Sequence, residues 1–121
     1  MKKKICVFLI VTMSILTGCS NEPPEGTSQE MYNIGLEALE ILDDYIDGKM
    51  SVDTCDRKID DLYEESEKIL EQTGSDYPND EIIHEDLLMI SISNTSAIYV
   101  GEHETYSHED NREMLKTDLG M

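Results

Sequence analysis

The fold of this chain is decided by residues 51–72, which read SVDTCDRKIDDLYEESEKILEQ. Apolar or small side chains recur there at three- and four-residue steps. They form a heptad-like seam of Val52, Cys55, Ile59, Leu62, Ser66 and Ile69. Most of the acidic residues fall on the opposite side. A segment with one apolar and one charged face is typical of a helix that packs against a core.

Two further segments, one on each side of it, repeat the helical spacing. The first contains Met31, Ile34, Ala38, Ile41 and Tyr45, and the second contains Ile83, Leu87, Ile90, Asn94 and Ala97. Gly48 and Gly74 suit the left-handed conformation that closes a helix. Because short connections force neighbouring helices to run antiparallel, the sequence predicts an all-α fold. We expect a small antiparallel three-helix bundle with helices near residues 28–47, 51–72 and 80–100.

One stretch of the third segment, Ile90–Val100, is open to a second interpretation. Its β-branched residues and the alternation of Ile90 and Ile92 also suit a β-strand. A single short strand would have no other strand to pair with. We therefore expect this stretch to be helical.

The N-terminus has the three parts of an export signal. Lysines at positions 2–4 form a positive start, and residues 5–16 (ICVFLIVTMSIL) form an uncharged apolar run. This run is shorter than the ~20 residues that a helix needs to cross a bilayer. The small residues Thr17 and Gly18 then precede Cys19.

The segment Leu16-Thr17-Gly18-Cys19 resembles the lipobox of bacterial lipoproteins. The resemblance implies that residues 1–18 are removed and that the Cys19 thiol carries a diacylglyceryl lipid. Two acyl chains, at ~0.8 kcal/mol per buried methylene, give a durable membrane anchor. The alternative is a secreted protein cleaved nearby, in which Cys19 has no special role. The resemblance covers only the first two dozen residues and implies nothing about the globular part.

The chain then divides into four parts. Residues 1–18 are the signal peptide, and residues 19–29 are the lipidated cysteine and a polar, flexible tether rich in proline and glycine. Residues 30–101 form the helical domain. Residues 102–121 are a polar tail, in which Tyr106–Leu119 either forms a short, weak helix or has no fixed structure. The expected location is the cell membrane, on its extracytoplasmic side, in either a Gram-positive or a Gram-negative envelope.

The charge balance excludes some partners. The full chain has a formal net charge of −18. Residues 1–18 carry three lysines and no acid, so their removal leaves six basic and 27 acidic residues, a net charge of −21. Nucleic acids and anionic lipid surfaces are bound through basic patches. We therefore expect no nucleic-acid partner, and membrane attachment through the lipid alone.

Few residues suggest a role in metal binding or catalysis. His103, Glu104 and His108 are weak candidates for a divalent metal site, and solvated tail residues are the simpler explanation of them. With Cys6 removed and Cys19 acylated, Cys55 is left alone, and we expect it to be a small buried hydrophobe. The motifs of common hydrolases, metalloproteases, phosphate-binding loops and thiol oxidoreductases do not occur. We expect no enzymatic activity and no cofactor besides the lipid.

Two functions remain. The first is a non-enzymatic interaction module that presents an apolar face to another envelope protein, because the stripes of residues 28–47 and 80–100 are broad for so small a core. The second is a lipoprotein that binds divalent cations through its acidic surface and its histidine-containing tail.

Overall fold

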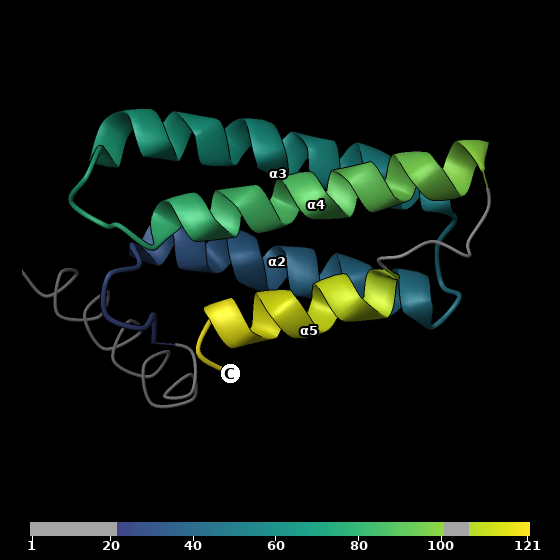
Figure 1. Ribbon diagram of the computed structural model, residues 1–121, viewed down its shortest axis with the longest axis horizontal. Coiled ribbons are helices and arrows are strands. Elements are labelled where there is room, and N and C mark those ends of the chain that lie inside the picture. The colour runs from purple at the N-terminus through teal and green to yellow at the C-terminus, as the bar shows by residue number, and fades with distance from the viewer. Residues whose placement is uncertain (1–21, 101–106) are drawn as a thin grey trace, which may run out of the picture.

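The computed structural model describes residues 22–100 and 107–121, and the regular structure within these ranges is entirely helical. These residues form four helices, α2 (Gln29–Ile46), α3 (Val52–Thr73), α4 (Asp80–Tyr99) and α5 (His108–Asp118). Figure 1 shows that successive helices run in opposite directions. The predicted all-α antiparallel bundle is therefore confirmed, with four helices in the described part of the chain rather than three.

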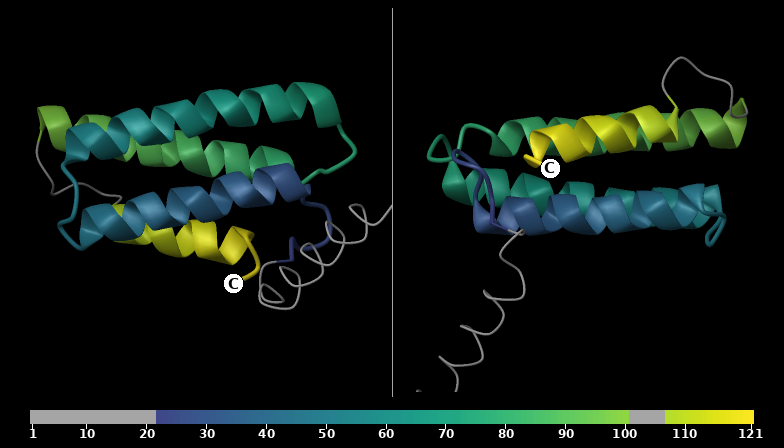
Figure 2. Two further views of the ribbon diagram at one scale, coloured as in Figure 1. Left: turned by 180° about the vertical axis from the view of Figure 1, so that it is seen from behind. Right: turned by 90° about the horizontal axis from the view of Figure 1, so that it is seen from below.

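The helices form two layers. Figure 2 shows α4 and α5 side by side in one layer and α2 and α3 in the other. Each helix packs against the next one along the chain, and α5 closes the bundle against α2. The most extensive contact is that between α3 and α4. Since α3 and α5 lie at opposite corners, each helix keeps one side toward solvent.

The helix ends follow from local chemistry. The Ser51 side chain caps α3 by accepting a hydrogen bond from the Thr54 N–H at 3.2 Å. Gly48 and Gly74, which lie just after the last turns of α2 and α3, have φ angles of +79° and +60°. The ambiguous stretch Ile90–Val100 lies almost entirely within α4, so the helical interpretation is confirmed.

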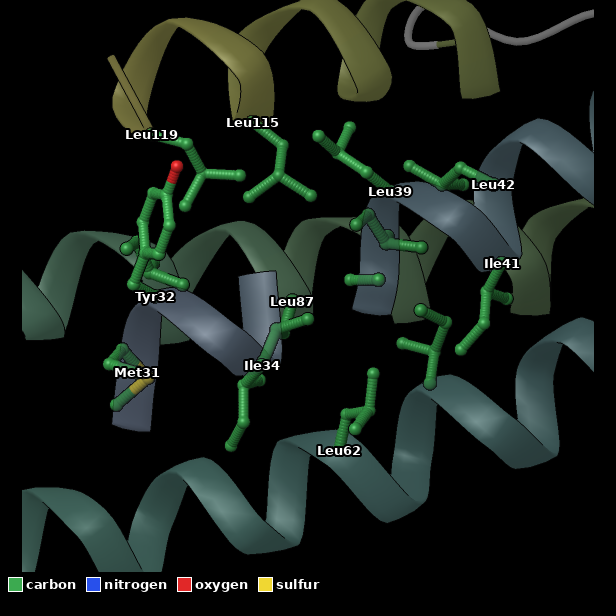
Figure 3. Close-up of a cluster of buried hydrophobic side chains, with 14 of the residues drawn as sticks. Met31, Tyr32, Ile34, Leu39, Ile41, Leu42, Leu62, Leu87, Leu115 and Leu119 are labelled. Carbon is green, nitrogen blue, oxygen red and sulfur yellow. The ribbon is translucent and has the colours of Figure 1, made fainter. Parts of the chain in front are cut away.

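The core lies between the two layers (Figure 3). All four helices contribute buried apolar side chains to it. The largest that are almost fully buried are Met31, Tyr32, Leu42, Ile59, Ile83, Leu87, Ile90, Leu115 and Leu119. Cys55 is also fully buried and carries a free thiol, as the sequence predicts.

The C-terminal helix α5 differs most from expectation. The sequence leaves both a short, weak helix and no fixed structure open for the polar tail, whereas His108–Asp118 forms a helix that is a full member of the bundle. Ser107 and Asp110 cap its start reciprocally, with each backbone N–H donating to the other side chain. Leu119 packs so closely on Gly35 of α2 that a Cβ there would lie 2.6 Å from Leu119 Cδ2. The helix is hard to find in the sequence because few of its side chains are apolar.

The tether is also shorter than predicted, because its second half is fixed to the start of α4. The Asn79 N–H donates to the Gly26 carbonyl at 2.9 Å, and Asn79 Nδ2 donates to the Glu25 carbonyl at 3.0 Å. The buried Asp80 carboxylate accepts from the Ser28 N–H at 2.8 Å and from the Ser28 hydroxyl at 2.7 Å. These bonds tie residues 25–28 to the bundle, although the sequence places them in a flexible segment.

Candidate functional site

The most unusual surface of the molecule is the outward face of α4. Leu88, Ile92 and Tyr99, which we call the α4 stripe, are 41%, 53% and 81% exposed. Their spacing of four and seven residues places them on one side of the helix. No charged residue occurs from Leu87 to Val100, although 30% of the whole chain is charged.

The α4 stripe is not a by-product of core packing. The core-facing side of α4 is formed by Ile83, Leu87 and Ile90, all fully buried. The solvent side of a bundle helix is normally polar, and α3 follows this rule with exposed acids along its length. From Leu87 onward, helix α4 is therefore apolar on two sides, of which the bundle covers only one.

One carboxylate of α3 is bonded to α4 near the stripe. The exposed Asp60 accepts a hydrogen bond from the hydroxyl of Ser91, the residue before Ile92, at 3.0 Å. Burial raises the pKa of the neighbouring Asp56, and Asp60 raises it further, although a hydrogen bond with Asn94 has the opposite effect.

A second acidic pair joins α4 to α5. Burial is the main cause that raises the pKa of Asp86 to about 8, with the adjacent Asp118 adding to the rise. Asp86 is only 4% exposed. If the carboxyl groups of Asp86 and Asp118 are both ionised, Asp86 Oδ2 has no hydrogen-bond partner. A proton on Asp86 lets it donate to Asp118 and removes the repulsion. With a pKa of about 8, the Asp86 carboxyl keeps its proton at neutral pH.

Further along the same interface, α5 is held by buried amide, hydroxyl and imidazole groups. His108 Nε2 and Asn94 Oδ1 are 2.7 Å apart, and because Oδ1 can only accept, the imidazole donates. Asn111 Nδ2 donates to Ser93 Oγ, also at 2.7 Å. The His108 ring lies 4.5 Å from the ring of Tyr45, between centroids. These polar contacts fix the position of α5 where apolar contacts are few.

The structure bears on one of the three predicted metal candidates. His103 and Glu104 lie outside the described residues. His108 is buried, and its Nε2 is engaged by Asn94. Within residues 22–100 and 107–121, no three His, Cys, Asp or Glu side chains are grouped so that they could hold a metal ion. The predicted lipidation residue, Cys19, also lies outside the described residues.

The pair of Ser66 and His84 is a feature that the sequence does not reveal. His84 is half-buried, and its Nδ1 lies 2.6 Å from Ser66 Oγ. Its ring stacks on Tyr63 with 4.4 Å between centroids. Ser66 is fully buried, and its hydroxyl donates to the Tyr63 carbonyl at 2.6 Å. A hydroxyl without access to solvent cannot act as a nucleophile, so this pair links α3 to α4.

Cys55 is equally unsuited to attack a substrate. Its side chain is fully buried, and its Sγ donates to Asn94 Oδ1 over 3.6 Å. Burial, the largest influence, raises the pKa of the thiol to about 11. Since the thiolate is the reactive form, Cys55 is an inert core residue.

An open groove of about 300 Å³ runs between α2 and α3. Its floor includes Ile41, Leu62 and Met50, and its only basic side chain is that of Lys58. Five carboxylates line its walls, those of Glu37, Glu40, Asp44, Asp61 and Glu65. The outer face of the α2/α3 layer is therefore strongly acidic as well.

None of the four described helices combines the length and the apolarity that crossing a bilayer requires. No family model, curated protein or solved structure matches the chain.

Proposed function

We propose that this protein is a small lipid-anchored interaction module on the extracytoplasmic side of the cell membrane. In this proposal Cys19 carries the diacylglyceryl lipid, and the α4 stripe binds another envelope protein. The protein catalyses no reaction. The observation that supports binding most strongly is the α4 stripe itself, with Tyr99 81% exposed in a segment, residues 87–100, that has no charged residue. Grouped large apolar side chains at a surface are typical of protein interfaces.

The proposed absence of catalysis is supported by the chemistry of the described residues. The two candidate nucleophiles, Ser66 and Cys55, are both fully buried. The groove between α2 and α3 brings together carboxylates and one lysine, without a histidine, serine or cysteine. The remaining feature that suits a function is the exposed α4 stripe, and an exposed apolar surface suits binding to another protein.

The anchor is tested on the membrane fraction of cells that produce the full chain. Mass spectrometry should find an N-terminal peptide that begins at acylated Cys19, and Cys19→Ala should leave the membrane fraction. A Cys19→Ala protein that is still lipidated, or a wild-type chain that starts elsewhere without lipid, would refute the anchoring.

The binding surface is tested by a double variant, Ile92→Ser with Tyr99→Ser. After chemical cross-linking in membranes, the wild type should recover an envelope protein that the double variant recovers at least ~10-fold less, as is expected when hot-spot side chains are truncated. Tyr77→Ser is a matched control, because Tyr77 is also an exposed aromatic residue (41%) but lies in the loop before α4. Equal recovery by the double variant would exclude the α4 stripe as the binding surface.

A further inference from the structure

Two carboxyl groups face each other between α4 and α5. Asn111 Nδ2 donates to Ser93 Oγ at 2.7 Å, which fixes the register of these antiparallel helices. Asp86 lies seven residues before Ser93 on α4, and Asp118 lies seven residues after Asn111 on α5. Seven residues are close to two helical turns, so this step leads from one facing pair to the next. The register therefore brings Asp118 opposite Asp86, and their side chains are within hydrogen-bonding reach of each other.

This pair has no counter-charge. Asp86 is 4% exposed, and its Oδ2 is shielded from solvent and has no hydrogen-bond partner unless the pair shares a proton. Within residues 22–100 and 107–121, neither Asp86 nor Asp118 forms an ion pair. The other charged side chain that acts on Asp86, that of Glu85, is also acidic. Since a buried carboxylate is costly unless it is neutralised, the pair requires a proton or a cation between its oxygens.

Water and small ions have access to the pair from one end of the bundle. Asp118 is partly exposed, and it lines an open cavity of about 290 Å³ together with Asn79, Ile82 and Thr117. Ile82 lies four residues before Asp86 and therefore on the same face of α4, so the cavity begins one turn from the buried carboxyl. Asp118 is also the last residue of α5, where the partial negative charge of a helix end favours a cation.

We infer that Asp86 and Asp118 bind one divalent cation of the oxygen-preferring class, Mg²⁺ or Ca²⁺, in the place that a shared proton otherwise holds. On binding, that proton passes to solvent. Carboxylates are the preferred protein ligands of both ions, and Mg²⁺ commonly keeps several waters beside one or two carboxylates. The ion joins α4 to α5. The site is separate from the α4 stripe, so this inference does not rest on the proposed binding of an envelope protein.

The first experiment measures binding to the full chain, purified in a non-ionic detergent, at pH 9 in 150 mM NaCl. This pH lies above the pKa of Asp86, about 8, so the proton no longer competes. The sodium chloride suppresses loose association with the other acidic side chains. Equilibrium dialysis with radioactive Ca²⁺ should give one site per chain with a Kd of ~0.1–1 mM, as in extracellular calcium modules, and Mg²⁺ should displace the Ca²⁺. The absence of a saturable site would overturn the inference.

The second experiment locates the ion, by thermal unfolding followed by circular dichroism. Replacing part of the NaCl by 10 mM CaCl₂ at equal ionic strength should raise the Tm of the wild type by at least ~5 °C. Asp86→Asn and Asp118→Asn should lose both the bound Ca²⁺ and this rise. Asp61→Asn is the matched control and should keep both, because Asp61 is an exposed carboxylate of the groove between α2 and α3.

The asparagine at position 86 can donate to Asp118 as the protonated carboxyl does, so this variant should keep the fold. An equal rise in Tm for Asp86→Asn and the wild type would show that Ca²⁺ acts by screening the acidic surface. A rise that is lost in Asp61→Asn instead would place the ion in the groove. Either result would overturn the assignment to Asp86 and Asp118.

Discussion

Replacing Asp86 by asparagine should stabilise the bundle at neutral and alkaline pH but not in acid. In the folded protein, burial and the neighbouring Asp118 raise the pKa of Asp86 from 3.8 to about 8. Between these two values the unfolded chain releases the Asp86 proton and the folded chain keeps it. Since stability falls with pH wherever the folded state binds more protons, this group destabilises the wild type progressively from about pH 4 to pH 8. Above pH 8 the loss is complete and constant.

The expected size follows from the shift. A change of about four pKa units sets an upper limit on the order of 5 kcal/mol. Asp118 is partly exposed, and water weakens its interaction with Asp86, so we expect about 2–4 kcal/mol at pH 8 and above. The asparagine amide can donate to Asp118 as the protonated carboxyl does. It has no proton to lose in this range, so the variant lacks this pH dependence.

The assay is urea unfolding followed by circular dichroism at pH 5, 7 and 9, for the wild type and Asp86→Asn. Glu64→Gln serves as a control, because it removes one exposed charge of α3 without touching the pair. The advantage of Asp86→Asn should grow with pH, while that of Glu64→Gln stays within about 0.5 kcal/mol. A difference between Asp86→Asn and the wild type that is the same at all three pH values would show that Asp86 is ionised in the folded protein.

Three further perturbations probe the docking of α5. Leu115→Ala should lower the free energy of unfolding by about 2–5 kcal/mol in urea titrations, whereas Met121→Ala, at an exposed site, should not change it measurably. Gly35→Ala should cost up to about 2 kcal/mol, because its Cβ meets Leu119, and should speed hydrogen exchange in α5. Deleting residues 107–121 should expose Leu42 and Leu87 and increase the binding of a hydrophobic dye; unchanged dye binding would contradict the place of α5 in the core.

Helices α2, α3 and α4 could be predicted because apolar side chains recur with helical spacing along their buried faces. Seams such as that of Ile59 and Leu62 mark a helix face without knowledge of its partner. For α5 the sequence leaves a weak helix and an unstructured tail open, because only Leu115 and Leu119 of its buried side chains are apolar and the others, such as His108 and Asn111, are polar. These residues are polar, and nothing in the sequence indicates that their partners lie on α4.

The candidate surface was partly predictable. The broad apolar stripe of residues 80–100 predicts more apolar surface than the core can hold, and Leu88 and Ile92 are exposed. The equally broad stripe of α2 is instead buried in the core, where Met31, Ile34, Ala38 and Ile41 are all less than 9% exposed. Which of two similar stripes stays exposed depends on how the helices are placed, and a pattern along one helix does not contain that information. The bond between Ser66 and His84 escapes prediction for the same reason.

The contacts of residues 24–28 determine which end of the bundle is nearest to the anchor. The start of α2, the loop before α4 and the C-terminus meet at one end (Figure 1), where Gly120 lies against Pro24. If Cys19 is lipidated, only residues 20–24 connect the lipid to this end, and five extended residues reach at most about 18 Å. A tag fused to the C-terminus would then be confined between the bundle and the bilayer. A label at Gly48, in the open turn at the opposite end, would point away from the membrane and leave α4 unobstructed.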